Sequence, residues 1–215
     1  MLKNSIKFTA CLALIIGFSV SFAGAYDDFF KAITFDDTRT IDKLLGQGFD
    51  ANSLDEKGQG ALYLSLREGS FKTTDLLLRQ PSVRIDQVNA AGETALMMAA
   101  LKGHTEWVQR LVDQGARLES PTPLGWTALH YAASGTEPRV VALLLARGAR
   151  IDALSPNGST PLMMAARYGH EDSVHLLLKQ GADQRLRNDQ HLDAADFARL
   201  GGREKLAAFL ATAAR

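Results

Sequence analysis

Histidine is the residue type whose spacing could support a metal site or a catalytic centre in this chain. His104 and His170 each follow a glycine, and His130 stands three residues after a threonine, so all three fit structural roles. His175 lies five residues after His170, whereas two ligands on one helix face would be four apart. His191 stands alone near the C-terminus. The sequence therefore predicts no catalytic residue, no metal site and no cofactor.

Other catalytic signatures are also missing from the sequence. No nucleophile elbow, phosphate-binding loop or HExxH zinc motif occurs in it. Lysine plus arginine and aspartate plus glutamate balance at 24 each, so no basic excess points to nucleic acid. Cys11 is the only cysteine, which excludes an internal disulfide and a multi-cysteine metal site. These features favour a protein that is not an enzyme.

The first 25 residues have the pattern of a secretory signal peptide. Lys3 and Lys7 precede an apolar run from Phe8 to Phe22, and Ala23-Gly24-Ala25 forms an A-x-A cleavage site. The run of 15 residues is shorter than the roughly 20 of a membrane-spanning helix, although an uncleaved anchor remains the alternative. We expect a periplasmic or secreted mature chain that begins at Tyr26, with 22 basic and 24 acidic residues and a net charge of −2.

A fixed period organises the rest of the chain. Gly92, Gly125 and Gly158 stand 33 residues apart, and a threonine two places after each opens a small-residue segment: GETALMMAA, GWTALHYAA and GSTPLMMAA. Such a period is typical of stacked repeats, which bury their core between neighbouring units and leave one long surface free. We expect function to lie on that surface and not in a pocket.

Each unit is predicted to contain two helices joined by a turn. Threonine hydroxyls would cap the first helices, and paired alanines would let neighbouring helices approach closely. Pro138 fits the first turn of a second helix, where its missing N–H costs little. The second helices would end at glycines in the left-handed conformation, namely Gly48, Gly115, Gly148 and Gly181.

The segments TALHYAA (127–133) and TPLMMAA (160–166) resemble the T-P-L-H-x-A-A signature of the ankyrin repeat. The resemblance covers essentially all of 26–215 and implies an all-α repeat solenoid of helix-turn-helix units linked by β-turn or hairpin fingers. Periodicity alone would also allow other helical solenoids. The predicted units are an N-terminal cap (26–54), an irregular repeat (55–88), three regular repeats (89–121, 122–154, 155–187) and a C-terminal cap (188–215).

The outer units and the second unit depart from the pattern. In the last unit His191 replaces the finger glycine and Asp193 replaces the capping threonine, as expected of a cap. In the second unit Gly60 replaces the threonine and Pro81 replaces the closing glycine. We expect any unusual bend of the stack at Arg79 to Gln87; the alternative is drift in a unit that stays packed.

Partners of ankyrin-repeat proteins usually contact the finger tips and the concave side of the first helices, and the resemblance carries this surface onto matching positions here. Trp126 stands out, because other units have Gln59, Glu93 or Ser159 at its position, and Trp, Tyr and Arg are enriched at binding hot spots. The alternative for Trp126 is packing on a neighbouring finger. The predicted contact residues are Arg67, Glu93, Leu101, Lys102, Leu124, Trp126, Asn157, Ser159, Arg167 and Tyr168.

Two other sets of large side chains are assigned to packing. Trp107 begins a second helix, where the convex-side core is expected. Met97, Met98, Met163 and Met164 stand at helical spacing in the first helices and are predicted to be core or semi-exposed filler.

The predicted function is that of an exported monomer that binds a protein partner on its concave face, with the Trp126 region as anchor. Nucleic acid, and membrane after cleavage, are not expected partners. Protection or inhibition of an enzyme or toxin is a role that such binding would serve. The alternatives are an enzyme that handles a metal or small molecule on the same scaffold, and a structural protein of the cell envelope.

Overall fold

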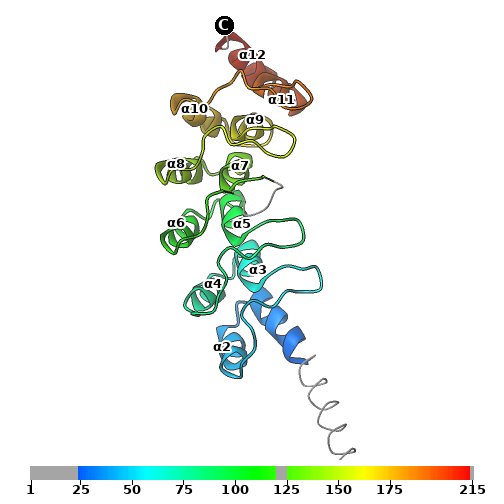
Figure 1. Ribbon diagram of the computed structural model, residues 1–215, viewed down its shortest axis with the longest axis vertical. Coiled ribbons are helices and arrows are strands. Elements are labelled where there is room, and N and C mark those ends of the chain that lie inside the picture. Colours follow the sequence, from blue (N-terminus) through cyan, green and yellow to red (C-terminus); the bar gives the residue numbers. More distant parts are fainter. Residues whose placement is uncertain (1–23, 120–124, 214–215) are drawn as a thin grey trace, which may run out of the picture.

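The computed structural model describes residues 24–119 and 125–213, which form a stack of helix pairs with loops projecting to one side (Figure 1). The inner row contains the first helix of each unit: residues 24–34, α3 (Ala61–Glu68), α5 (Ala95–Leu101), α7 (Ala128–Ser134), α9 (Pro161–Arg167) and α11 (Ala194–Leu200). The outer row contains the second helices: α2 (Thr38–Gly46), α4 (Phe71–Leu78), α6 (Thr105–Asp113), α8 (Pro138–Ala146), α10 (Glu171–Lys179) and α12 (Glu204–Ala213).

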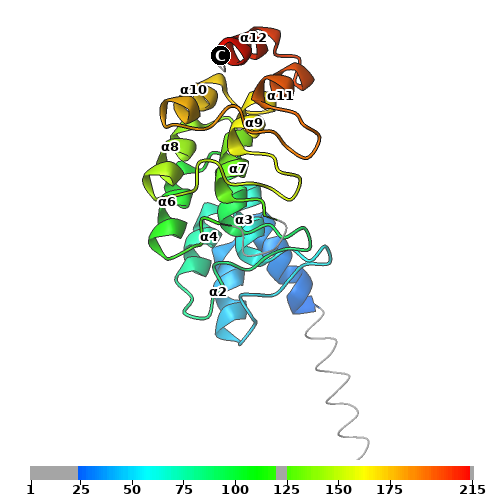
Figure 2. The same cartoon turned by 45° about the horizontal axis from the view of Figure 1, so that its top comes forward.

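The two rows and the projecting loops remain distinct in the turned view of Figure 2. Backbone hydrogen bonds close the fully described fingers, as between Asn89 N–H and Glu93 O at 3.0 Å and between Ser155 N–H and Ser159 O at 2.9 Å. Among the described residues no strand forms, and one isolated antiparallel bridge joins Leu54 and Gly60. The predicted all-α repeat solenoid is confirmed.

Threonine caps start the regular inner helices, as the sequence predicts. The hydroxyls of Thr94, Thr127 and Thr160 each accept a hydrogen bond from the backbone N–H three residues later. The side chain of that third residue accepts the threonine N–H in return, through the sulfur of Met97 at 3.4 Å and through Nδ1 of His130 at 3.2 Å. The local sequence therefore fixes where these helices begin.

Two sets of residues adopt left-handed backbone conformations. The finger residues Gly58, Gly92, Gly125 and Gly158 have φ values of 71, 80, 67 and 72°, and His191 continues the series at 60°. Gly48, Gly115, Gly148 and Gly181 follow the outer helices with φ values of 89, 90, 89 and 93°, as predicted. Because His191 keeps the conformation of a finger glycine, the register of the repeat extends into the last unit.

The later turns between inner and outer helices need glycine for a different reason, which is close approach to the preceding unit, whereas Gly69 and Gly103 in the earlier turns are left-handed. A Cβ on Gly169 would lie 2.0 Å from the carbonyl oxygen of Ala133, in the preceding unit. A Cβ on Gly201 would lie 2.6 Å from the carbonyl oxygen of Arg167. At these two turns, the C-terminal end of the inner helix in the preceding unit comes so close that no side chain would fit.

Neighbouring units are also tied together by side chains that accept backbone N–H bonds across the unit boundary. The acceptors are Asn52, Asp86, Glu119 and Asp152, and the donors one unit later are Arg84, Arg117, Arg150 and Asp183, at 2.7, 2.9, 3.3 and 3.0 Å. The Arg117 and Arg150 side chains also pair with Asp86 and Glu119. This series repeats along the stack and fixes the spacing of its units.

In the outer row the backbones of α4 and α6 approach each other less closely than those of α2 and α4 or of α6 and α8. Large rings fill this position: Phe71 and Trp107 stack with their centroids 5.4 Å apart, and Arg110 pairs with Asp75. Trp107 is only 7% exposed, which confirms its predicted place in the core. This wider backbone spacing lies between the irregular second unit and the third, while the bend at Arg79 to Gln87 stays a prediction.

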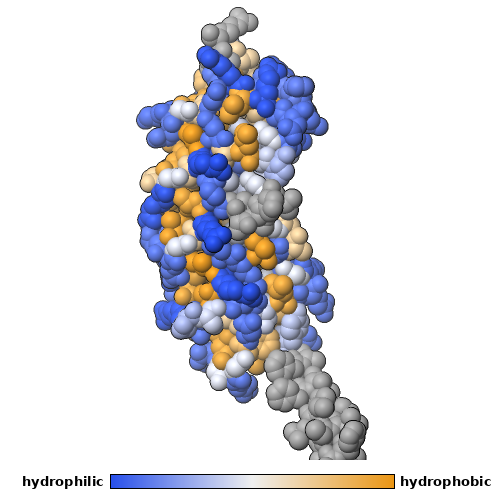
Figure 3. All heavy atoms as spheres, in the orientation of Figure 1, coloured by the Kyte–Doolittle hydropathy of each residue, from blue (hydrophilic) through white to orange (hydrophobic). Residues whose placement is uncertain are grey.

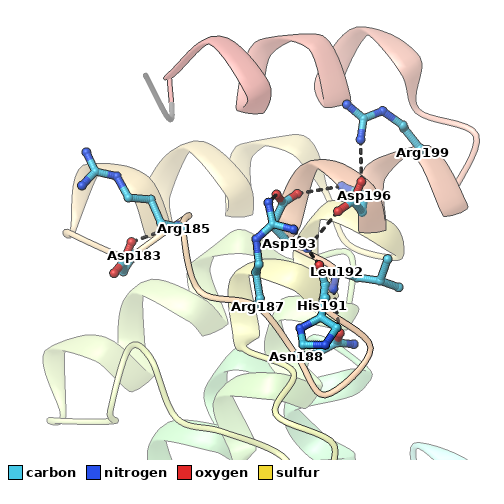
Figure 4. A network of polar contacts seen from close by, with 9 residues as sticks. All are labelled: Asp183, Arg185, Arg187, Asn188, His191, Leu192, Asp193, Asp196 and Arg199. Carbon is cyan, nitrogen blue, oxygen red and sulfur yellow. Dashed lines mark hydrogen bonds and ion pairs between the residues drawn. The ribbon is translucent and has the colours of Figure 1, made fainter.

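The last unit holds its finger by a polar network (Figure 4). The Asn188 side chain accepts the backbone N–H of Gln190 and of Leu192, each at 3.0 Å. Arg187 donates to the carbonyl oxygen of His191 at 2.7 Å and to the carboxylate of Asp193 at 3.0 Å. Asp193 in turn caps α11. These bonds hold the finger where histidine stands in place of glycine.

The predicted signal peptide falls almost wholly on residues 1–23, which lie outside the described residues. Residues 24 and 25 belong to the helix over 24–34. Within the described part of the chain, no helix has both the length and the apolar character needed to cross a membrane.

Candidate binding surface

A carboxylate and two tyrosines from three successive units meet on the inner row. Glu93 lies in the finger just before α5, and its Oε2 accepts hydrogen bonds from the Tyr63 hydroxyl and the Asn89 side-chain amide, both at 2.7 Å. Its Oε1 accepts the Tyr131 hydroxyl at 3.0 Å. We call Tyr63, Asn89, Glu93 and Tyr131 the Glu93 cluster. It joins α3, the finger before α5, and α7.

The Glu93 cluster carries a negative charge that no basic group of the described residues neutralises by an ion pair. Burial by itself would raise the pKa of Glu93, but the hydrogen bonds from Tyr63, Asn89 and Tyr131 together lower the pKa below its ordinary value. Within residues 24–119 and 125–213 no lysine, arginine or histidine forms an ion pair with Glu93. Glu93 therefore remains a partly buried, unpaired anion at neutral pH.

The two tyrosines stay protonated and keep donating. Burial raises the pKa of Tyr63 and of Tyr131 well above the ordinary tyrosine value, and the neighbouring Glu93 carboxylate raises both further. A hydroxyl that donates to a carboxylate loses this bond on ionisation and gains a like charge beside it. The cluster is therefore an ordered set of neutral donors around one charge.

Trp126 extends this surface toward the next finger. Its ring is partly exposed and meets the rings of His130 and Tyr131 edge to face, with centroids 5.2 and 6.3 Å away. The indole thus packs against its own unit and also adjoins the Glu93 cluster through Tyr131. Leu124, predicted to lie beside it, is outside the described residues.

The other predicted contact residues lie at two further places. Arg67, Leu101 and Lys102 stand at the C-terminal ends of α3 and α5, where Arg67 pairs with Glu68. Arg167 and Tyr168 end α9, with the guanidinium 4.9 Å from the tyrosine ring centroid. These positions lie at the helix ends away from the fingers, although the Arg67 side chain reaches back to Gln59 in the finger of its own unit. Trp126 and Glu93 lie at the finger ends of the inner helices. The structure therefore brings together Glu93 with Trp126 and, separately, Arg167 with Tyr168.

The finger of the fifth unit contains the last two predicted residues. Asn157 is exposed, and its side-chain oxygen lies 2.6 Å from the Ser155 hydroxyl. Ser159 is 1% exposed, so its side chain lies inside the finger and only its neighbours reach the surface. Its carbonyl oxygen instead lies 3.0 Å from Nε2 of His130.

The histidines have separate local roles. Nε2 of His104 lies 3.2 Å from the carbonyl oxygen of Leu66, whereas Nδ1 of His170 accepts the N–H of Asp172 at the start of α10. His175 lies near Glu171, one turn earlier in α10. In the described ranges no three His, Cys, Asp or Glu side chains come close enough together to hold a metal ion.

Hydrophobic and hydrophilic residues alternate in small patches along the face shown in Figure 3. No broad apolar area dominates that face among the described residues. One surface hollow, of about 650 Å³, lies between the second and third units and is lined by residues including Leu54, Arg84 and Gln87. Arg117 and Asp86, which also line it, already form an ion pair.

Sequence reasoning missed Tyr63, Asn89 and Tyr131. The available signal was two tyrosines in inner helices where other units place methionine: Tyr63 matches Met97, and Tyr131 matches Met98. The two tyrosines stand at different positions within their helices, so the 33-residue period does not align them.

Comparison with known proteins agrees with this architecture. A family model for ankyrin repeats, three copies, matches residues 29–122 and 108–188, which is most of the chain. This protein belongs to the ankyrin-repeat family, whose repeats are non-catalytic scaffolds for protein–protein interaction.

Two curated relatives share parts of the repeat array. The chain is 34% identical over 71 residues to the poly [ADP-ribose] polymerase tankyrase of Caenorhabditis elegans. It is 41% identical over 56 residues to ankyrin repeat domain-containing protein 29 of Danio rerio. The aligned segments cover 32% and 26% of this chain but 3% and 19% of the relatives, so the chain spans a small part of each relative's length.

Proposed function

We propose that this protein is exported and holds a protein partner on its inner row and fingers, which form the concave face expected of the family. It acts as a monomer without catalysing a reaction, and binding protects or inhibits the partner. The observation that carries this proposal is the Glu93 cluster with Trp126, an ordered group of aromatic and charged side chains at the finger end of the inner row.

Trp126 and Tyr168 are the proposed anchors. Trp126 is partly exposed and Tyr168 is 54% exposed, although both belong to aromatic types that usually bury most of their surface. Aromatic side chains in such positions often supply most of the binding energy of an interface. Trp126 lies before the start of α7 and Tyr168 follows the end of α9, so two anchors at opposite ends of neighbouring inner helices would engage the partner across the width of the inner row.

The test of the anchors is affinity capture from the extract of the producing cell's envelope, with wild type, Trp126→Ala and Tyr168→Ala. We expect each change to weaken binding of one discrete partner roughly tenfold to thirtyfold, which corresponds to about 1.5–2 kcal/mol. Phe209→Ala is the matched control, because Phe209 is an exposed aromatic on the outer helix α12. Equal recovery of every partner by all variants would contradict the anchor assignment.

Export has its own measurement. Expression of the full chain in a host with a secretory pathway, followed by N-terminal sequencing, is expected to give a mature protein that starts at Tyr26. Recovery of the uncleaved chain in the membrane fraction would instead support an anchor, and recovery of the uncleaved chain with soluble intracellular protein would contradict export.

A further inference from the structure

We propose that the Glu93 cluster is a recognition site for one basic side chain, an arginine or lysine, in an exposed segment of the partner. The proposal rests on the function proposed above, because it names the chemistry by which that partner is recognised. It also gives Glu93 a more specific role than that of a general contact residue.

The charge of Glu93 is the first reason. A partly buried carboxylate is stable when hydrogen bonds or a cation compensate for its lost hydration. Here hydrogen bonds from neutral groups hold the charge in place, and no cation among the described residues pairs with it. A cation from outside the chain would complete the site.

One arginine of the chain, Arg67, is held by other groups. It is close enough to affect the pKa of Tyr63, yet its guanidinium bonds to the side chains of Gln59 and Glu68. The site is therefore not filled by the protein itself. It remains available to a donor from a partner.

The carboxylate also has bonding capacity left. Oε2 accepts two hydrogen bonds but Oε1 accepts only one, and each carboxylate oxygen has two lone pairs. Oε1 is also the oxygen that accepts the Tyr131 hydroxyl, and the Tyr131 ring adjoins the partly exposed Trp126 ring. A cation seated there would gain a charge-assisted hydrogen bond and contact with aromatic rings, both of which favour arginine or lysine.

The first experiment compares a defined cationic probe with a neutral isostere. The full chain is titrated with N-acetyl-arginine amide and, separately, with N-acetyl-citrulline amide, while NMR follows the indole N–H signal of Trp126. We expect a saturable shift with the arginine probe and at least tenfold weaker binding of the citrulline probe. Equal binding of both probes, or no saturable shift with arginine, would overturn the proposal.

The second experiment removes the charge from the protein. Glu93→Gln keeps a side-chain oxygen that accepts a tyrosine hydroxyl, and we expect it to weaken binding of the arginine probe at least tenfold. Glu106→Gln is the matched control, because Glu106 is an exposed glutamate on the outer helix α6, and it should bind as wild type does. Circular dichroism checks the fold of both variants. If Glu93→Gln does not fold, the comparison of the two probes on wild type decides by itself.

Two further outcomes separate this proposal from the function on which it rests. In the first, a partner requires Trp126 but binds the Glu93→Gln variant as tightly as wild type, and the arginine probe gives no saturable shift. That result would overturn the cation site and leave the proposed binding function intact. Saturable arginine binding without any Trp126-dependent partner would support the cation site and contradict the proposed anchor. If the NMR signal of the Trp126 indole N–H shifts with protein concentration in the absence of any probe, the site binds a second copy of this chain. That result would overturn the proposal.

Discussion

His130 is buried at the start of α7, and its ring makes two hydrogen bonds that fit the neutral form. Its Nδ1 accepts the N–H of Thr127 at 3.2 Å, so the proton is assigned to Nε2, which donates to the carbonyl oxygen of Ser159 at 3.0 Å. A second proton would have to enter on Nδ1, which faces the Thr127 N–H and lies 2.9 Å from the Thr127 hydroxyl oxygen. Burial, the largest influence, lowers the pKa of His130 from 6.5 to about 4.

Because of this lowered pKa, the free energy of unfolding should decrease as the pH falls. Because the folded-state pKa lies below the unfolded value, the unfolded chain takes up the proton first as the pH falls. The contribution of neutral His130 is complete above pH 6.5 and is lost between about 6.5 and 4. We expect urea unfolding to show a loss of roughly 2–3 kcal/mol from this residue between pH 7.5 and 4.5.

The control for this prediction is His130→Met, since Met97 and Met163 fill the matching positions and their sulfur atoms accept the capping threonine N–H. Methionine cannot take up a proton, so the variant should show a shallower decline of unfolding free energy with falling pH. Parallel pH profiles for the two proteins would show that His130 is not the titrating group.

At the scale of the helix and turn, Gly169 is the most constrained position. Since a Cβ there would lie 2.0 Å from the carbonyl oxygen of Ala133, Gly169→Ala would push α9 away from α7. We expect a loss of more than about 3 kcal/mol in unfolding free energy, measured by urea titration.

The same substitution at Gly46 provides the opposite control. Gly46 lies at the end of α2 with no atom within 4 Å of an added Cβ, so Gly46→Ala should stabilise the protein by up to about 1 kcal/mol through helix propensity. Similar effects of the two changes would show that close packing at Gly169 is not what the turn requires.

The elements could be predicted from sequence because their signals are local. Thr94 and Gly115 mark a helix start and a helix end through bonds and conformations within a few residues, and the structure confirms both. The Glu93 cluster could not be found in this way, because Tyr63 and Tyr131 converge on Glu93 from separate units and from different positions in their helices. The burial of Ser159 depends likewise on how a finger folds over its own side chains.

In the whole molecule, each unit is stabilised by its neighbours. Leu111, Leu144 and Leu177 are fully buried at matching positions of the outer helices, so each should contribute similarly. We expect Leu144→Ala, in the middle of the stack, to lower the unfolding free energy by roughly 2–5 kcal/mol in urea titrations. Leu145→Ala is the control, because Leu145 is only partly buried, and an equal loss there would contradict the predicted register.

Arg203 joins the last unit to the one before it. Its removal should show whether the last unit can unfold locally or only together with the whole stack. Its guanidinium donates to three carbonyl oxygens at the C-terminal end of α9, those of Ala165, Ala166 and Gly169, at 2.9, 3.0 and 3.0 Å. These carbonyls belong to a helix end, where the macrodipole favours a cation. Arg203→Ala would leave them without this donor at a unit boundary.

Because a stack is held by nearest-neighbour contacts, loss of this joint should loosen α11 and α12 first. Hydrogen exchange followed by mass spectrometry is expected to show at least tenfold faster exchange in 194–213, with little change in α5 to α8. Arg199→Ala is the control, since Arg199 pairs only with Asp196 within its own helix and should leave exchange nearly unchanged. Uniform acceleration along the whole chain in Arg203→Ala would show instead that the stack unfolds as a single cooperative unit.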